Sequence, residues 1–161
     1  MKNFILLLLL AIFLSPAYGQ LKVKATCNAF VVDLLNGKVN DVRPDFTGAQ
    51  IKAKFPCFTS EEPETSKCGG VINYKDRDLK FFTGRDYVEI GPTFKGTLSI
   101  PLMGSKRGSL FKYLGNPKMK DANWDAFETQ YGTLILYYNA ASKVNLIRFS
   151  TKTMDVIQLC E

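Results

Sequence analysis

The sequence of 161 residues contains no histidine. Histidine is the usual general base of Ser-His and Cys-His catalytic pairs and a common ligand of metal ions. Its absence excludes hydrolases of those two types and all histidine-containing metal sites. The four cysteines form no C-x-x-C pair, and their spacings match no zinc site. We therefore expect neither a metal ion nor a cofactor.

Without histidine, the main catalytic chemistry still open to the chain uses carboxylates, because a glycosidase needs only two of them. The acidic pairs that are close in sequence all lie in polar segments that resemble turns, where solvated surface charge is the ordinary explanation. These pairs are Glu61 and Glu62, Asp76 and Asp78, and Asp121 and Asp125. A histidine-free hydrolase acting on glycans is thus an alternative hypothesis, and we expect no catalytic residue.

Long hydrophobic runs are also missing, apart from one near the N-terminus, from Phe4 to Leu14. This run is about half as long as the roughly 20 residues of a membrane span. It follows Lys2 and precedes Ala17-Tyr18-Gly19, which has small residues at the −3 and −1 positions of a cleavage site. The pattern predicts a secretory signal peptide over 1–19. It also predicts one secreted or periplasmic domain over 20–161, with no membrane span.

The cysteines all lie after the predicted signal peptide. An even number of cysteines in an exported chain favours disulfides over free thiols. Four cysteines allow three pairings, and we favour two particular bonds. Cys57 with Cys68 would close the acidic loop between them, and Cys27 with Cys160 would join the ends of the domain.

Most of the expected elements are strands, because short segments rich in β-branched and aromatic residues alternate with polar turns. The expected strands are 71–74, 79–82, 86–90, 96–102, 134–138, 144–150 and 154–159. Residues 28–35 fit a short helix and one strand of a hairpin around Asn36-Gly37 equally well.

Short helices are expected over 47–55, with Thr47 as N-cap, and over 105–114, before Gly115. A further turn over 122–129 would direct Trp124 and Phe127 inward. The sequence therefore predicts an α+β fold, with a mainly antiparallel sheet and short helices packed on one face.

The half-chains 44–103 and 104–161 share an order of elements: a short helix ending at proline, a loop, a glycine-led strand ending in tyrosine, and further strands. Gly70 and Tyr74 would correspond to Gly132 and Tyr138. A period of about 60 residues is longer than that of solenoid repeats, so it predicts a tandem αβββ duplication rather than a repeat array.

The helix end Leu114-Gly115-Asn116-Pro117, the strand YGTLILYY and the closing strand IRFST resemble the β-lactamase inhibitor proteins and related small outer-membrane-assembly lipoproteins. The resemblance covers mainly the second half-chain. It implies binding to a protein through the sheet face or loops, without catalysis, and it assigns no interface residue. Unlike the lipoproteins, this chain has no anchoring cysteine.

Basic and aromatic residues of the second half-chain form the candidate binding surface. Because an exported protein seldom meets nucleic acid, we expect no nucleic-acid partner and favour a protein or an envelope component. The leading hypothesis is an exported, non-catalytic binding protein, inhibitor-like or assembly-like. Besides the hydrolase, the alternative is a small-ligand carrier with its site inside a curved sheet. The candidate surface consists of Lys106, Arg107, Lys112, Tyr113, Lys118, Lys120 and Trp124.

Overall fold

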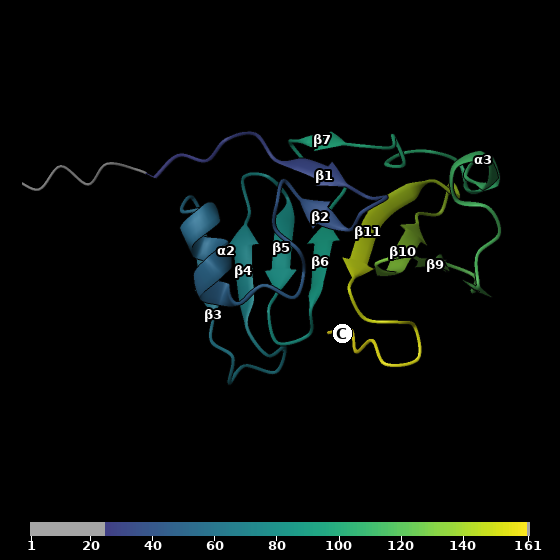
Figure 1. Ribbon diagram of the computed structural model, residues 1–161. Coiled ribbons are helices and arrows are strands. Elements are labelled where there is room, and N and C mark those ends of the chain that lie inside the picture. The colour runs from purple at the N-terminus through teal and green to yellow at the C-terminus, as the bar shows by residue number, and fades with distance from the viewer. Residues whose placement is uncertain (1–24, 161) are drawn as a thin grey trace, which may run out of the picture.

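The structure, a computed structural model that describes residues 25–160, is built around an eight-stranded antiparallel sheet (Figure 1). The predicted signal peptide over 1–19 lies outside the described residues. In spatial order the strands are β3 (Ser60–Glu62), β4 (Val71–Tyr74), β5 (Leu79–Phe82), β6 (Tyr87–Ile90), β11 (Val144–Ser150), β10 (Gly132–Tyr138), β9 (Trp124–Thr129) and β8 (Met119–Lys120).

Side chains alternate between the two faces of this sheet, as the pleat of a strand requires. On β4, Ile72 and Tyr74 belong to the large buried cluster on what we call the first face, whereas Val71 belongs to a smaller cluster on the second face. On β6, Val88 lies in the first cluster and Tyr87 in the second. Both faces of the sheet are therefore partly apolar.

A short helix and a small sheet cover the first face, which confirms the predicted α+β class. Helix α2 (Gly48–Lys54) begins at Thr47, whose side chain forms a capping box with Gln50, and it buries Ile51. The small sheet has the order β2 (Lys38–Val39), β1 (Val31–Asp33), β7 (Thr97–Leu98), and its β1–β7 pair is parallel.

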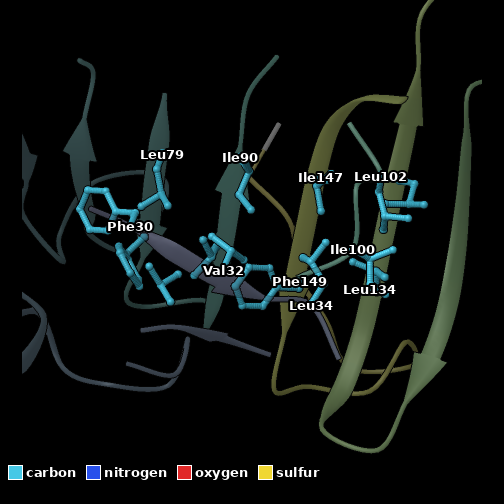
Figure 2. Packing of buried hydrophobic residues seen from close by; sticks show 14 of the residues in the cluster. Phe30, Val32, Leu34, Leu79, Ile90, Ile100, Leu102, Leu134, Ile147 and Phe149 are labelled. Atoms are coloured by element: carbon cyan, nitrogen blue, oxygen red, sulfur yellow. The ribbon is translucent and has the colours of Figure 1, made fainter. Parts of the chain in front are cut away.

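Residues 28–35, for which helix and strand were equally expected, form a strand and the start of a hairpin. Figure 2 shows Phe30, Val32 and Leu34 pointing into the core in every second position. The turn uses Gly37 at φ 62°, where a Cβ atom would lie 2.4 Å from the Tyr131 ring. The hydroxyl of Tyr131 donates a hydrogen bond to the carbonyl of Leu34 at 3.0 Å, so the hairpin is bound to the second half-chain.

The second predicted helix is shorter than expected. Residues 105–114 contain a 3-10 turn, η2 (Arg107–Ser109), and a single turn of α-helix, α3 (Phe111–Leu114), which ends at Gly115 with φ 69°. The expected strand 96–102 is reduced to β7. Leu110, between η2 and α3, is the residue of this segment that is buried in the first cluster.

Two other expectations are wrong. Residues 122–129, expected to form a turn, contain β9, so Trp124 and Phe127 point to opposite faces instead of inward together.

Residues 154–159, expected to form a strand, form none. Strand β11 already has β10 on one side and β6 on the other, which leaves no free edge for the segment that follows it. That C-terminal segment (151–160) crosses to the second face, where Leu159 and Cys160 pack.

The favoured disulfide pairing is also wrong, because the bonds are Cys27–Cys57 and Cys68–Cys160. Cys27 and Cys57 pack against the first-face cluster, whereas Cys68 and Cys160 pack against the second-face cluster. The sheet therefore separates Cys57 from Cys68 despite their closeness in sequence. The described cysteines are all bonded, as expected.

The two half-chains contribute two runs of four strands, β3 to β6 and β8 to β11, which meet where β6 pairs with β11. The correspondence expected from the sequence would match β4 with β10. These strands hold different positions, since β4 is second from its edge of the sheet and β10 is third from the other. Over residues 25–160, no helix is long and apolar enough to cross a membrane.

Candidate contact surface and groove

The exposed aromatic and basic residues of the predicted surface lie on or directly beside η2, α3 and the edge strand β8. We define the α3–β8 surface as Lys106, Phe111, Lys112, Tyr113, Lys118 and Lys120, all exposed. Phe111 and Tyr113 are 63% and 41% exposed. From Lys106 to Lys120 the sequence carries five basic residues and no acidic one: Lys106, Arg107, Lys112, Lys118 and Lys120. The surface is therefore basic and aromatic, and Glu128, which borders a hollow beside Tyr113 and pairs with Lys118, is an acidic neighbour.

Helix α3 contributes to two hollows. Phe111 and Lys120 line a hollow of about 410 Å³ with Pro117. Tyr113 lines another, of about 680 Å³, with Leu35 from the tip of the β1–β2 hairpin. Leu35 is itself 57% exposed. Exposed apolar side chains therefore lie beside hollows into which a partner's side chains could insert.

The charges of this surface are only loosely paired. The Lys112 ammonium lies 4.6 Å from the centre of the Tyr113 ring. Lys118 pairs with Glu128 at 3.2 Å, but both side chains are more than half exposed, and such pairs contribute about 0–1 kcal/mol to stability. Water competes for these contacts, so a partner's carboxylates could replace them at low cost.

Arg107, one of the predicted contact residues, is held within the fold by several hydrogen bonds and borders the hollow beside Phe111. Its Nε donates to a carboxylate oxygen of Asp125 at 3.0 Å, and its guanidinium also donates to the carbonyls of Asp121 and Ala122. The hydrogen bond to Asp125 raises the pKa of Arg107. The guanidinium lies 4.8 Å from the centre of the Tyr138 ring.

Asp125 is buried, contrary to its expected place in a solvated turn. It is 3% exposed and also accepts a hydrogen bond from the Tyr138 hydroxyl at 2.7 Å. It lies on β9, opposite Leu136 in the register, which explains why its side chain points into the first face. Burial is the main reason that the pKa of Tyr138 is raised.

Trp124 is separated from the rest of the predicted surface, because alternation along β9 turns it to the second face. There it lines an apolar groove with a volume of about 380 Å³. Strands β8 to β10 form one wall and the C-terminal segment forms the other. We call this the second-face groove, and its residues are Met119, Trp124, Ala126, Ile135, Tyr137, Met154, Ile157 and Leu159.

The Cys68–Cys160 disulfide and the hydrogen bond from the Cys160 amide to the Tyr87 hydroxyl, at 3.2 Å, fix the end of the C-terminal segment. Figure 1 shows the segment in yellow, leaving β11 and returning to the sheet. Its other end is held by the Thr133 hydroxyl, which donates to the carbonyl of Lys152 at 2.8 Å. Burial raises the pKa of Tyr87 to about 12.

An ionic cluster lies beside the groove. Glu89, 7% exposed, accepts from Lys80 at 2.7 Å and from Arg148 at 2.9 Å. Arg148 donates through Nη1 to the hydroxyl of Tyr137 at 3.0 Å. Tyr137 also lines the groove, so its ring and hydroxyl join the apolar groove to the charged cluster.

Each acidic pair considered as a catalytic candidate has at least one member with a structural partner. Glu61 pairs with Lys52 at 2.6 Å, and Asp78 accepts from the amide and hydroxyl of Thr93. No group of three histidine, cysteine, aspartate or glutamate residues within 25–160 could hold a metal ion.

The groove was not predicted from the sequence. The sequence feature that indicates an apolar second face is the strand Gly132–Tyr138, where Ile135 and Tyr137 alternate with Leu134 and Leu136. A strand with apolar residues at successive positions presents apolar side chains on both faces, so other segments have to cover both faces. This pattern indicated an apolar second face, but not which segment would lie across it.

Comparisons of the chain with protein-family models, curated proteins and solved structures gave no match. The resemblance to the β-lactamase inhibitor proteins and small assembly lipoproteins therefore remains a prediction.

Proposed function

We propose that this protein is an exported, non-catalytic binding protein whose α3–β8 surface binds an acidic face of another protein. One observation carries the proposal: exposed Phe111 and Tyr113 stand among lysines in a part of the chain that has no acidic residue. Large exposed apolar side chains surrounded by polar ones are typical of interaction sites.

The two kinds of side chain would contribute differently to binding. Aromatic residues that enter a partner's pockets supply most of the binding free energy of many interfaces. Lysines at the rim mainly accelerate association and select an acidic partner. The hollows beside Phe111 and Tyr113 would receive side chains of that partner.

Export is supported by the predicted signal peptide and by the two disulfides, which persist in oxidising compartments. An inhibitor or an assembly factor would fit this kind of binding. Tandem duplication is part of the same proposal: the two runs of four strands that meet at β6 and β11 support it, with β4 corresponding by position to β9 rather than to β10.

The test compares affinity capture from the protein's native surroundings by the wild type and by Lys112→Gln/Lys118→Gln/Lys120→Gln. We expect the triple variant to lose the captured protein, with at least tenfold weaker binding once that protein is purified. The dependence on salt should weaken in parallel, because screened charge attraction is what the variant removes.

A matched control is Lys54→Gln/Lys75→Gln/Lys95→Gln, which removes the same charge at exposed lysines elsewhere. It should capture the partner as the wild type does. Equal loss with both triple variants would mean that net charge alone decides binding, which contradicts the proposal. Binding only to vesicles of anionic lipid would also contradict it, in favour of an envelope surface.

A further inference from the structure

We propose that the second-face groove is a binding site for a small amphipathic molecule with an unbranched apolar chain and one carboxylate group. This inference goes beyond the proposed function, because it concerns the groove on the second face and a different kind of ligand; Lys118 is the residue of the α3–β8 surface that also borders this region. The large buried cluster fills the first face, so a ligand site on the sheet would have to lie on the second face.

The lining suits an apolar chain. A volume of about 380 Å³ lies at the lower end of the roughly 300–1,000 Å³ of small-molecule sites. Both walls contribute a methionine, Met119 from β8 and Met154 from the C-terminal segment, and methionine adapts to ligands of irregular shape. Ile135 lies on the sheet wall, and Ile157 faces the groove from the C-terminal segment.

The charge at one end selects an anion. There, Tyr137 receives its hydrogen bond from Arg148, and the cluster of Arg148, Lys80 and Glu89 has two positive charges and one negative, a net charge of +1. Lys80 lies on β5, two strands from β11, so Arg148 is the member of the cluster next to the groove.

The other end repels an anion. Met119 and Met154 also border a neighbouring hollow, whose charged residues are Lys118, Glu128 and Asp155, with one positive charge and two negative ones. A carboxylate would therefore lie at the Arg148 end, with its apolar chain running toward Met119. This difference in charge gives the ligand a single direction in the groove.

Trp124 makes the site directly testable, because it is the only tryptophan and lines the groove. We would titrate the oxidised protein with decanoate and with decanol, below their aggregation concentrations, and record tryptophan fluorescence. We expect a saturable change with decanoate and at least fivefold weaker binding of decanol. Arg148→Met should remove this difference, whereas Arg43→Met, which changes an exposed arginine, should keep it.

A second variant covers the case in which Arg148→Met fails to fold. Ile157→Glu places an anion in the wall formed by the C-terminal segment, outside the sheet, and should weaken decanoate binding at least tenfold. Equal binding of decanoate and decanol would overturn the carboxylate selectivity. A fluorescence change that never saturates, or one that Ile157→Glu leaves intact, would overturn the site itself.

Discussion

At the scale of single residues, burial decides what a charged side chain does. Asp125 and Glu128 lie on the same strand, three residues apart, and each pairs with one basic residue. Asp125 is buried against Arg107 and Tyr138, whereas Glu128 is exposed beside Lys118. The two carboxylates should therefore contribute very differently to stability.

We expect Asp125→Ala to lower the free energy of unfolding by about 2–4 kcal/mol, because it leaves the Arg107 guanidinium and the Tyr138 hydroxyl without their acceptor. Glu128→Ala should cost about 0.5 kcal/mol or less. Urea denaturation of both variants would measure the difference. Similar losses in the two variants would contradict a special role for the buried carboxylate.

Asp33 provides a prediction about pH. The side chain of Asn36 and the amides of Leu35 and Asn36 donate to its carboxylate at 2.7–3.1 Å, and the Asn36 side chain is the main reason that the pKa of Asp33 is lowered. A carboxylate whose pKa is lower in the folded state stabilises the fold above its ordinary pKa. That stability is lost as the pH falls through the folded-state pKa.

Asp33→Asn should therefore be less stable than the wild type at neutral pH, by about 1 kcal/mol. The difference should persist down to about pH 4, near the ordinary aspartate pKa, and close at lower pH. Denaturation curves recorded across this range would show it. Asp41→Asn, at an exposed site, removes the same charge and serves as the control; it should leave stability at neutral pH nearly unchanged. A stability difference between Asp33→Asn and the wild type that grows as the pH falls would contradict this prediction.

At the scale of secondary structure, α2 shows how local signals can fix an element. Its N-cap, its apolar pair Ile51 and Phe55, and Pro56 after its end are all local features of the sequence. The helix has only seven residues and would be unstable alone, so packing of Ile51 and Phe55 into the first-face core stabilises it.

Thr47→Ala removes the side-chain acceptor of the capping box and should destabilise the protein by about 1 kcal/mol. Thr65→Ala, at an exposed position in the loop before β4, should change stability by less than about 0.5 kcal/mol. Thermal or urea denaturation would compare them. An unchanged midpoint for Thr47→Ala would mean that packing alone holds the helix.

At the scale of the whole molecule, each disulfide holds one face of the sheet. Cys27–Cys57 fixes the segment before β1 to the end of α2, and Cys68–Cys160 fixes the C-terminal segment to the second face. The sequence separations are 30 and 92 residues. Loop-closure entropy predicts contributions of about 3.5 and 4.5 kcal/mol respectively.

Peptide mapping without reduction should recover Cys27 joined to Cys57 and Cys68 joined to Cys160. The double change Cys68→Ser/Cys160→Ser should release the C-terminal segment, so trypsin should cut after Lys152 faster than in the wild type. Cys27→Ser/Cys57→Ser is the matched control and should leave that cleavage slow. Recovery of a Cys57–Cys68 peptide would contradict the described fold.

The sequence alone determined features that depend on neighbouring residues. It determined the strands 71–74, 79–82 and 144–150, because alternation and polar turns are local, and the cap and end of α2 for the same reason. It also located exposed lysines and Tyr113 on one stretch of chain. The predicted signal peptide and the absence of histidine likewise needed only the sequence.

Tertiary structure decided everything that depends on which face of the sheet a residue occupies. The pairing of β11 between β6 and β10 removed the expected last strand and sent residues 151–160 across the second face. The sheet divided the cysteines into pairs that their spacing did not indicate. Alternation along β9 moved Trp124 into the groove and Asp125 into the core. These outcomes depend on contacts between distant segments, which no local pattern encodes.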